Sequence, residues 1–125
     1  LGEYEKAQKI FEDYRASVGQ KLKGITQLGY IYGIMGKVKK AREILKLMEQ
    51  RDIEDKDVSL SMDFAVVYLG LKDKDKVFEY LRNALDEHLG GILFINTNPI
   101  WEDIRDDQRF DELIEEIGMR EKQPA

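Results

Sequence analysis

The chain lacks cysteine and has little proline, histidine or tryptophan: two prolines, one histidine and one tryptophan among 125 residues. Without cysteine it forms neither disulfides nor thiolate metal sites, and with one histidine it has no paired-histidine zinc motif. It also lacks any run near the roughly 20 apolar residues of a membrane span, and any leading secretory or transit segment. We therefore expect a cytoplasmic protein with no metal, no cofactor and no membrane contact.

The residues that are present are typical of a single helix-rich domain. Hydrophobic residues make up 42% of the chain and charged residues 36%, and we expect one domain over residues 1–119 and a frayed tail, 120–125. Charge is uneven: residues 1–51 carry eleven basic and six acidic side chains, and residues 52–125 carry nine and nineteen. The net charge is −5. Without a continuous basic stripe, the chain is a poor match for nucleic acid.

An internal repeat appears when the sequence is compared with itself. A shift of 34 residues places LGEYEKAQKIFEDY (1–14) on MGKVKKAREILKLM (35–48). From that second copy, a shift of 36 places Leu28 on Phe64, Tyr32 on Tyr68 and Leu45 on Leu81. We assign residues 1–18 to the second half of a truncated repeat, 20–51 and 55–89 to two full repeats, and 90–119 to an atypical closing segment.

Each full repeat is predicted to be a pair of helices. Apolar residues recur at helical spacing in the first copy, with Leu28, Tyr32 and Met35 on one segment and Val38, Ala41, Leu45 and Met48 on the next. Glycine inside a helix costs roughly 1 kcal/mol against alanine. Gly36 suits the turn between the helices and Gly29 suits their close approach. We expect Gly33 on an open face, where a bare stretch of helix would let a ligand backbone approach.

The closing segment breaks the period and has its own helix signals. Asn98 and Pro99 predict a cap and a first helical position. Asp106 or Asp107 is predicted to cap a final helix that stops at Gly118, with the apolar stripe Phe110, Leu113, Ile114 and Ile117. We expect Trp101 to be buried there. A repeat array needs such a terminal unit to cover its last apolar face.

The pattern resembles the tetratricopeptide repeat. A small residue is followed three positions on by an aromatic one, and nine further on by another small or branched one: Gly29, Tyr32 and Ala41, then Ala65, Tyr68 and Val77. The resemblance covers roughly residues 1–89 and implies an all-α fold, a right-handed α-α superhelix of helical hairpins. It lacks the usual opening tryptophan and closing proline of each repeat.

The closing segment also resembles the end of tetratricopeptide domains in bacterial and archaeal signalling proteins. That resemblance rests on Pro99, Trp101, Arg105, Arg109, Phe110 and Leu113. Those domains follow winged-helix regulators, nucleotide cyclases or kinases, so the resemblance implies the C-terminal part of a larger regulatory protein.

A search for catalytic residues finds no constellation that carries chemistry. The single histidine, His88, falls near a helix end, where a surface position is the plain interpretation. The segment LKDKDK (71–76) lacks the glycine and glutamate of a calcium loop and predicts a turn capped by Asp73 or Asp75. The carboxylates of 103–116 lie opposite an apolar stripe and indicate a solvated helix face. We expect no enzyme activity.

The tetratricopeptide resemblance implies that the first helix of each pair lines a concave surface. The candidate partner-binding residues are Lys23, Thr26, Gln27, Tyr30, Gly33 and Ile34 in the first repeat, and Ser59, Met62, Asp63, Val66 and Leu69 in the second. One subclass of these repeats grips a C-terminal carboxylate, but here Tyr30 stands where asparagine is expected and Asp63 would repel the ligand. We expect a protein partner that presents a helix or extended segment.

Residues 2–17 have an apolar stripe of Tyr4, Ala7, Phe11 and Tyr14, suited to pack on a helix outside the chain. An open face of this size exceeds what monomers usually tolerate. We expect upstream residues or a second chain to cover it, which leaves a homodimer as an alternative function. An enzyme or small-ligand sensor that uses a pocket near Tyr30, Trp101 and the acidic tail is a second alternative. A DNA-binding helix-turn-helix is disfavoured by the charge and by the repeat.

Overall fold

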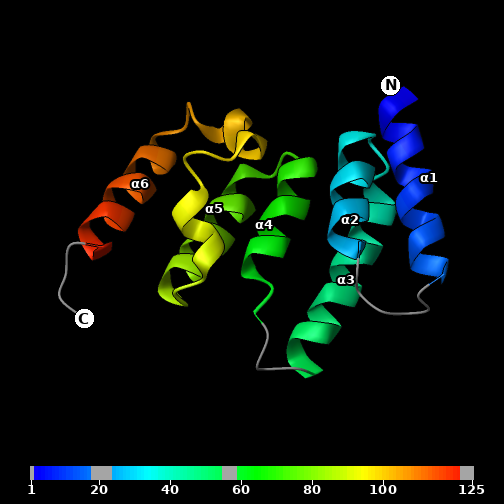
Figure 1. Ribbon diagram of the computed structural model, residues 1–125, viewed down its shortest axis with the longest axis horizontal. Helices are drawn as coiled ribbons and strands as arrows, with labels where there is room; N and C mark the ends of the chain where they lie inside the picture. Colours follow the sequence, from blue (N-terminus) through cyan, green and yellow to red (C-terminus); the bar gives the residue numbers. More distant parts are fainter. Residues whose placement is uncertain (1, 18–23, 55–58, 122–125) are drawn as a thin grey trace.

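A computed structural model describes residues 2–17, 24–54 and 59–121, and within these ranges every regular element is helical. The elements are α1 (Gly2–Ser17), α2 (Ile25–Ile34), α3 (Val38–Glu54), α4 (Ser61–Gly70), α5 (Lys74–Asp86), the 3₁₀ helices η1 (Gly90–Phe94) and η2 (Pro99–Ile104), and α6 (Gln108–Glu121). They follow one another in a row from α1 to α6 (Figure 1). The chain is therefore all-α, as predicted.

The two predicted hairpins, α2–α3 and α4–α5, close with the same backbone hydrogen bonds. In the first turn Gly36 N donates to Gly33 O (3.1 Å) and Lys37 N to Tyr32 O (2.7 Å); in the second, Lys72 N donates to Leu69 O (3.0 Å) and Asp73 N to Tyr68 O (3.1 Å). Each bond has its counterpart 36 residues away. The shift read from the sequence therefore relates equivalent backbone positions, and Asp73 caps α5 by accepting from Lys76 N.

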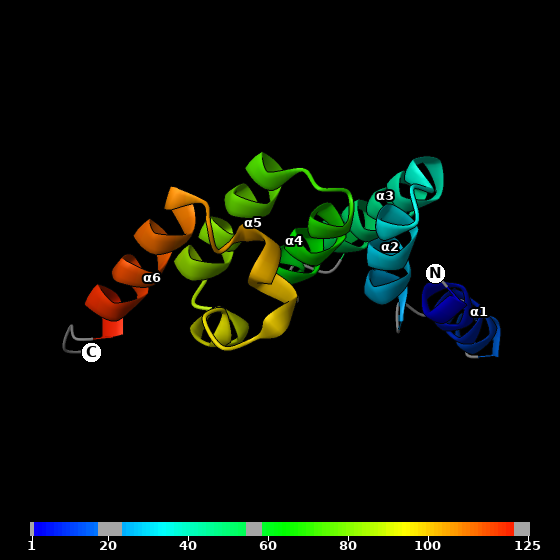
Figure 2. The ribbon, with the colours of Figure 1, turned by 90° about the horizontal axis from the view of Figure 1, so that it is seen from above.

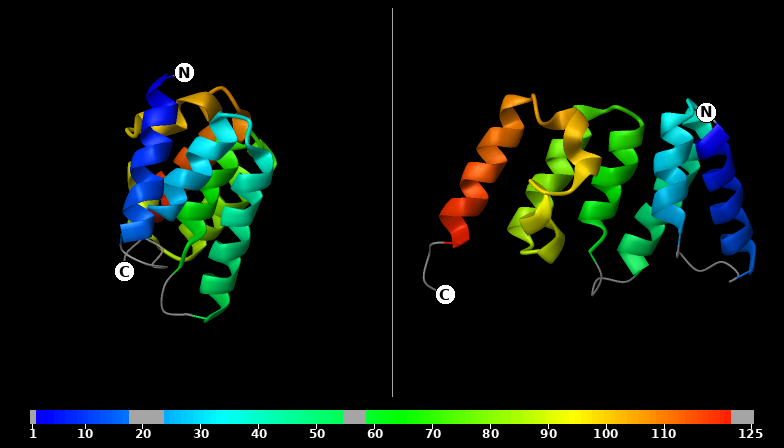
Figure 3. Two further views of the ribbon diagram at one scale, coloured as in Figure 1. Left: turned by 90° about the vertical axis from the view of Figure 1, so that its right-hand side faces the viewer. Right: turned by 45° about the horizontal axis from the view of Figure 1, so that its top comes forward.

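The predicted apolar stripes form the interior. Within each hairpin the two helices pack against each other, and α2 also lies along α4 (Figure 3). One cluster joins the first hairpin to α4 and contains Leu28, Tyr32, Ala41, Leu45, Met48, Phe64 and Val67. A larger one joins the second hairpin to the C-terminal segment and contains Ala65, Leu69, Val77, Leu81, Trp101, Phe110 and Leu113, among others. These two clusters hold the row of helices together.

Glycines set the contact between α2 and α4. A Cβ added at Gly29 would lie 2.9 Å from the Ile44 side chain on α3 and 2.8 Å from the Val67 side chain on α4, so the predicted close approach within the hairpin is confirmed and a second one joins α2 to α4. A Cβ at Gly33 would lie 2.6 Å from the Gly70 carbonyl carbon, and one at Gly70 would lie 2.4 Å from Tyr30 O. The expectation that Gly33 lies on an open face is wrong. It is the point where two helix backbones touch.

Residues 90–107 fold back over the second hairpin (Figure 2). Asn98 Oδ1 accepts from Ile100 N (3.1 Å) ahead of Pro99, as predicted, and Asp107 Oδ1 accepts from Arg109 N (2.9 Å) at the start of α6. Trp101 is 2% exposed, so its predicted burial is confirmed. Ile92, Ile95 and Ile104 are buried beside it in the larger cluster.

The last helix extends further than predicted. It continues through Gly118 to Glu121, because no positive φ is needed at that glycine and Arg120 ties the final turn to α5. Arg120 donates to Leu85 O (3.2 Å) and to Asp86 Oδ1 (2.9 Å). The predicted frayed tail is therefore wrong at Arg120, while residues 122–125 lie outside the described part of the chain.

Candidate protein-interaction site

The predicted partner-binding residues fall into three groups. Seven of them form what we call the α2–α4 face: Thr26, Gln27, Tyr30 and Ile34 on α2, with Met62, Asp63 and Val66 on α4. Gln27 is exposed and the other six are partly buried. Leu69 is only 5% exposed and belongs to the core, Gly33 contacts Gly70, and Ser59 Oγ accepts a hydrogen bond from Ser61 N (3.3 Å) at the start of α4. Lys23 lies outside the described residues.

The C-terminal segment explains why Leu69 is buried. Met62, Val66 and Tyr30 pack against the larger cluster, to which residues 92–104 contribute four fully buried side chains. A Cβ added at Gly91 would lie 3.6 Å from Met62 Cε, which places η1 against the start of α4. The C-terminal segment thus covers much of the second hairpin's first helix, and the surface left open to a partner centres on α2 and the first turn of α4.

Asp63 has the most unusual environment on this face. Its carboxylate accepts hydrogen bonds from Thr26 Oγ1, at 3.0 Å from Oδ1, and from its own backbone amide, and no residue in the described ranges forms an ion pair with it. Burial raises the pKa of the Asp63 carboxyl, and the hydrogen bonds from Thr26 and from the backbone amide of Asp63 only partly oppose the shift. The carboxylate is therefore only partly satisfied.

Tyr30 lies at the centre of the α2 part of the face. Burial is the main cause that raises the pKa of its phenol, and the negative charge of Asp103 on η2 adds to the effect. Sequence reasoning identified both Tyr30 and Asp63 as candidates. It missed the contribution of Asp103, because that residue comes to α2 only through the fold of the closing segment.

The apolar stripe of α1 faces α2, so the expectation that it packs on a helix outside the chain is wrong at Phe11. Phe11 is partly buried against the first cluster, Glu12 accepts a hydrogen bond from Tyr32 Oη that lowers the pKa of Glu12, and Lys37 Nζ donates to Gln8 Oε1 (2.6 Å). Ala7 is partly buried as well, and the Tyr14 side chain lies outside what the structure describes. Ile10 is 65% exposed, and Tyr4, which belongs to the same stripe as Ala7 and Phe11, is 41% exposed.

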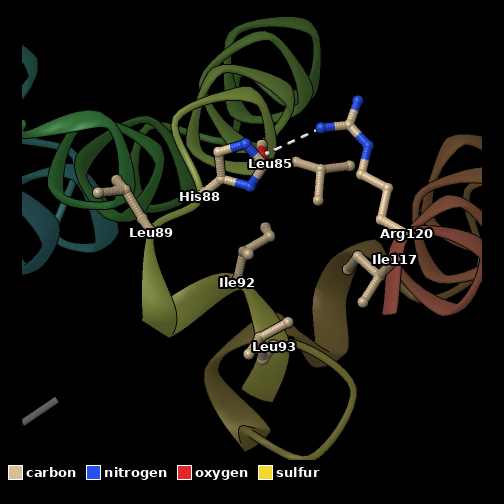
Figure 4. A pocket seen from close by; sticks show the side chains of 7 residues that line it. All are labelled: Leu85, His88, Leu89, Ile92, Leu93, Ile117 and Arg120. Carbon is tan, nitrogen blue, oxygen red and sulfur yellow. Dashed lines mark hydrogen bonds between the residues drawn. The ribbon is translucent and has the colours of Figure 1, made fainter. Parts of the chain in front are cut away.

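A small pocket of about 180 Å³ lies between α5, η1 and α6, and no sequence signal pointed to it (Figure 4). Its lining is apolar except at the rim, and consists of Leu85, His88, Leu89, Ile92, Leu93, Ile117 and Arg120. The Arg120 guanidinium already donates to Leu85 O, Asp86 and Glu116. His88 ends α5 with a positive φ of 58° and is exposed, as predicted for a helix-end surface position.

Some acidic residues of the last third form ion pairs with arginine. Arg109 binds Asp75 (2.7 Å) and Asp107 (2.9 Å), and its guanidinium lowers the pKa of Asp107 to about 2. In the described ranges, no group of three or more histidine, cysteine, aspartate or glutamate side chains is placed to hold a metal ion, and no helix there is long and apolar enough to cross a membrane. The small-ligand sensor alternative required Trp101 to lie at a pocket, but Trp101 is buried in the core.

Comparisons with known proteins give no match: no family model, no curated protein and no solved structure is significantly similar to the chain.

Proposed function

We propose that the chain is a tetratricopeptide-type, non-catalytic interaction scaffold that binds a peptide or helix of a partner protein on its α2–α4 face. The observation that carries the proposal is the equivalence of the two hairpins. Their turn hydrogen bonds recur 36 residues apart, and α2 packs along α4. Successive first helices placed in this way form a continuous surface in repeat proteins, with residues 90–119 as the terminal cap.

The chemistry of the face fits a protein partner. Tyr30, Ile34, Met62 and Val66 are partly buried and present apolar surface interrupted by a few polar groups. Mixed surfaces of this kind, with an aromatic side chain near the centre, are typical of peptide and helix recognition. Since the C-terminal segment covers part of α4, we expect a small interface and transient binding.

The resemblance of the closing segment favours a cytoplasmic signalling protein as the setting, with the scaffold as its C-terminal part. In that setting the α2–α4 face would receive a segment of another component and position it relative to the regulatory domain. No step of this role requires a catalytic group, a cofactor or a nucleic acid.

Blocking the face tests the proposal. Linear peptides selected from a displayed random library on the wild-type chain should lose at least about tenfold in affinity on Gln27→Trp, because the indole occupies the exposed edge of α2. The matched control is Asn83→Trp on α5, an equally exposed amide away from the face, which should bind as wild type. A library that yields no binder, or binders equally indifferent to both substitutions, would contradict the proposal.

A homo-oligomerisation module is the second candidate, favoured by the exposure of Ile10 and Tyr4 on α1. A second copy that covers α1 would make the sedimentation coefficient depend on protein concentration, and Ile10→Glu would abolish that dependence. A concentration-independent monomer would exclude this candidate and leave the scaffold proposal intact.

A further inference from the structure

Resting on the proposed function, we infer that the partner segment of the α2–α4 face presents a cationic side chain, arginine or lysine, that pairs with Asp63. The face would then select basic segments, the opposite of the carboxylate-gripping mode known for other repeats of this type.

Asp63 has no counter-charge among the residues that the structure describes. Thr26 supplies one neutral hydrogen bond at 3.0 Å, and an ionised carboxylate accepts up to about four hydrogen bonds. Three other partly buried carboxyls, Glu12, Asp107 and Glu116, each have a hydroxyl or arginine partner whose hydrogen bond lowers the carboxyl pKa. The pKa of Asp63 is instead raised.

The position of Asp63 at the start of α4 offsets only part of the cost of burying its charge. Asp63 lies in the first turn of α4, where the partial positive charge of the helix terminus stabilises a carboxylate by about 0.3–1 kcal/mol at exposed sites. That position explains why an acidic residue is tolerated. It leaves the oxygen that Thr26 does not reach available as an acceptor for a partner.

Apolar surface lies beside the Asp63 carboxylate. Met62 and Tyr30 are partly buried and flank the position with hydrophobic atoms. Arginine and lysine carry long aliphatic stems that pack on such atoms while the charged head reaches an anion. A cationic side chain can therefore make both an apolar contact and an ion pair with the face. A neutral donor such as serine could make only a hydrogen bond.

The charge of the surroundings points the same way. Asp103 acts on Tyr30 from η2, where Lys72 and Lys74 line the same pocket as Asp103, so Asp63 is the carboxylate of the described face that lacks an ion-pair partner. Arginine residues of the C-terminal segment are engaged elsewhere: Arg105 with Glu102 and Asn96, and Arg109 with Asp75 and Asp107. A basic segment approaching this face meets attraction, and an acidic one meets repulsion.

The test is a mutant cycle on selected peptides, acetylated and amidated to remove terminal charge. The variant is Asp63→Asn, which keeps an acceptor for Thr26 and removes the charge, and the control is Asp111→Asn in the first turn of α6, an exposed position. We expect the selected peptides to share an arginine or lysine. Their affinity should fall about tenfold on Asp63→Asn and stay unchanged on Asp111→Asn.

Replacing the shared arginine by citrulline, or the lysine by norleucine, should weaken binding to the wild-type chain by the same factor, and should have no further effect on the Asp63→Asn variant. Binders that tolerate Asp63→Asn but fail on Gln27→Trp would overturn this inference and leave the scaffold function standing. A library that yields no binders would overturn both. Concentration-dependent self-association that Asp63→Asn abolishes would assign the carboxylate to a second copy of the chain and also refute the inference.

Discussion

The hairpins α2–α3 and α4–α5 differ at the residue that closes each turn and in what covers their first helices. The first turn uses Gly36 with a φ of 76°, and the second uses Lys72 with a φ of 62°. The hydrogen bonds are equivalent in both. The backbone geometry of the repeat is therefore kept by the pattern of bonds, and the second copy accepts a side chain in a left-handed conformation that favours glycine.

Equivalent positions on α2 and α4 also differ in how exposed they are. Position 27 on α2 is an exposed glutamine, while its equivalent on α4, Asp63, is partly buried; position 33 is a glycine, while its equivalent, Leu69, is buried under the C-terminal segment. A closing segment that packs on one hairpin converts part of the surface of its first helix into core. The binding surface of a short array is then set by how far the cap reaches, as well as by the repeats themselves.

Truncating the equivalent core leucines gives the largest expected effect. Leu81→Ala should lower the free energy of unfolding by about 4 kcal/mol and Leu45→Ala by about 3 kcal/mol, within the usual 2–5 kcal/mol for this change. Leu81 is fully buried and belongs to the larger cluster, whereas Leu45 retains 3% exposure. Urea unfolding measures both, and equal or inverted losses would mean that burial under the C-terminal segment does not make Leu81 the more important of the two leucines for stability.

Adding a single methyl group between the hairpins should cost about 3 kcal/mol, at the upper end for overpacking. Gly70→Ala places its Cβ 2.4 Å from Tyr30 O, and neither backbone can yield without separating α2 from α4. Gly118→Ala is the matched control. It lies inside α6 with nothing within 4 Å, and it should gain about 0.5–1 kcal/mol from helix propensity. Equal changes for both variants would show that the helices are not held backbone to backbone.

Exchanging the turn residues tests the first difference directly. Lys72→Gly should stabilise the chain by about 0.5–1 kcal/mol, since relief of the left-handed conformation outweighs the added entropy of the unfolded state. Gly36→Lys should destabilise it by a similar amount. The measurement is the free energy of unfolding of each single variant and of the double exchange. Loss of stability in Lys72→Gly would mean that the lysine side chain contributes contacts beyond its backbone conformation.

The sequence predicted what depends on local patterns. Burial of Leu28, Leu45 and Leu81 followed from helical spacing, and the caps at Asn98 and Asp107 from the residue types that accept backbone hydrogen bonds. Contacts between segments that are far apart in the chain could not be predicted from the sequence. The meeting of Gly33 with Gly70 is a property of a pair of helices, and neither residue signals it alone.

The site shows the same limit. Thr26, Tyr30, Met62 and Asp63 were identified from their place on first helices, and the structure gathers them on one face. Leu69 has the same helical register but lies under residues 90–104, and only the tertiary fold shows that. The path of the chain after Gly118 was misjudged for a related reason, because the ion pair that holds Arg120 against α5 overrides the local tendency of glycine to end a helix.

Asp63→Asn should give the smallest effect, a gain in stability of about 0.5 kcal/mol at pH 7, the usual scale for a partly exposed position. The pKa of Asp63 is raised in the folded chain, so the unfolded chain loses this proton at a lower pH than the folded chain does. Stability therefore falls as the pH rises through the interval between the two pKa values, and the loss persists at neutral pH. Removing the charge removes that loss, so the gain should be present at pH 7 and vanish below about pH 3.9.

The measurement compares urea unfolding of the variant and the wild-type chain at both pH values, with Asp111→Asn as the variant that should show no gain at either. A destabilised Asp63→Asn at neutral pH would mean that a cation of the chain already pairs with the carboxylate. A gain at neutral pH would instead show that the Asp63 charge lowers the stability of the free chain. Such a cost is expected of a charge that serves to bind a partner. Gln27, the equivalent residue on the first hairpin, is uncharged and carries no such cost.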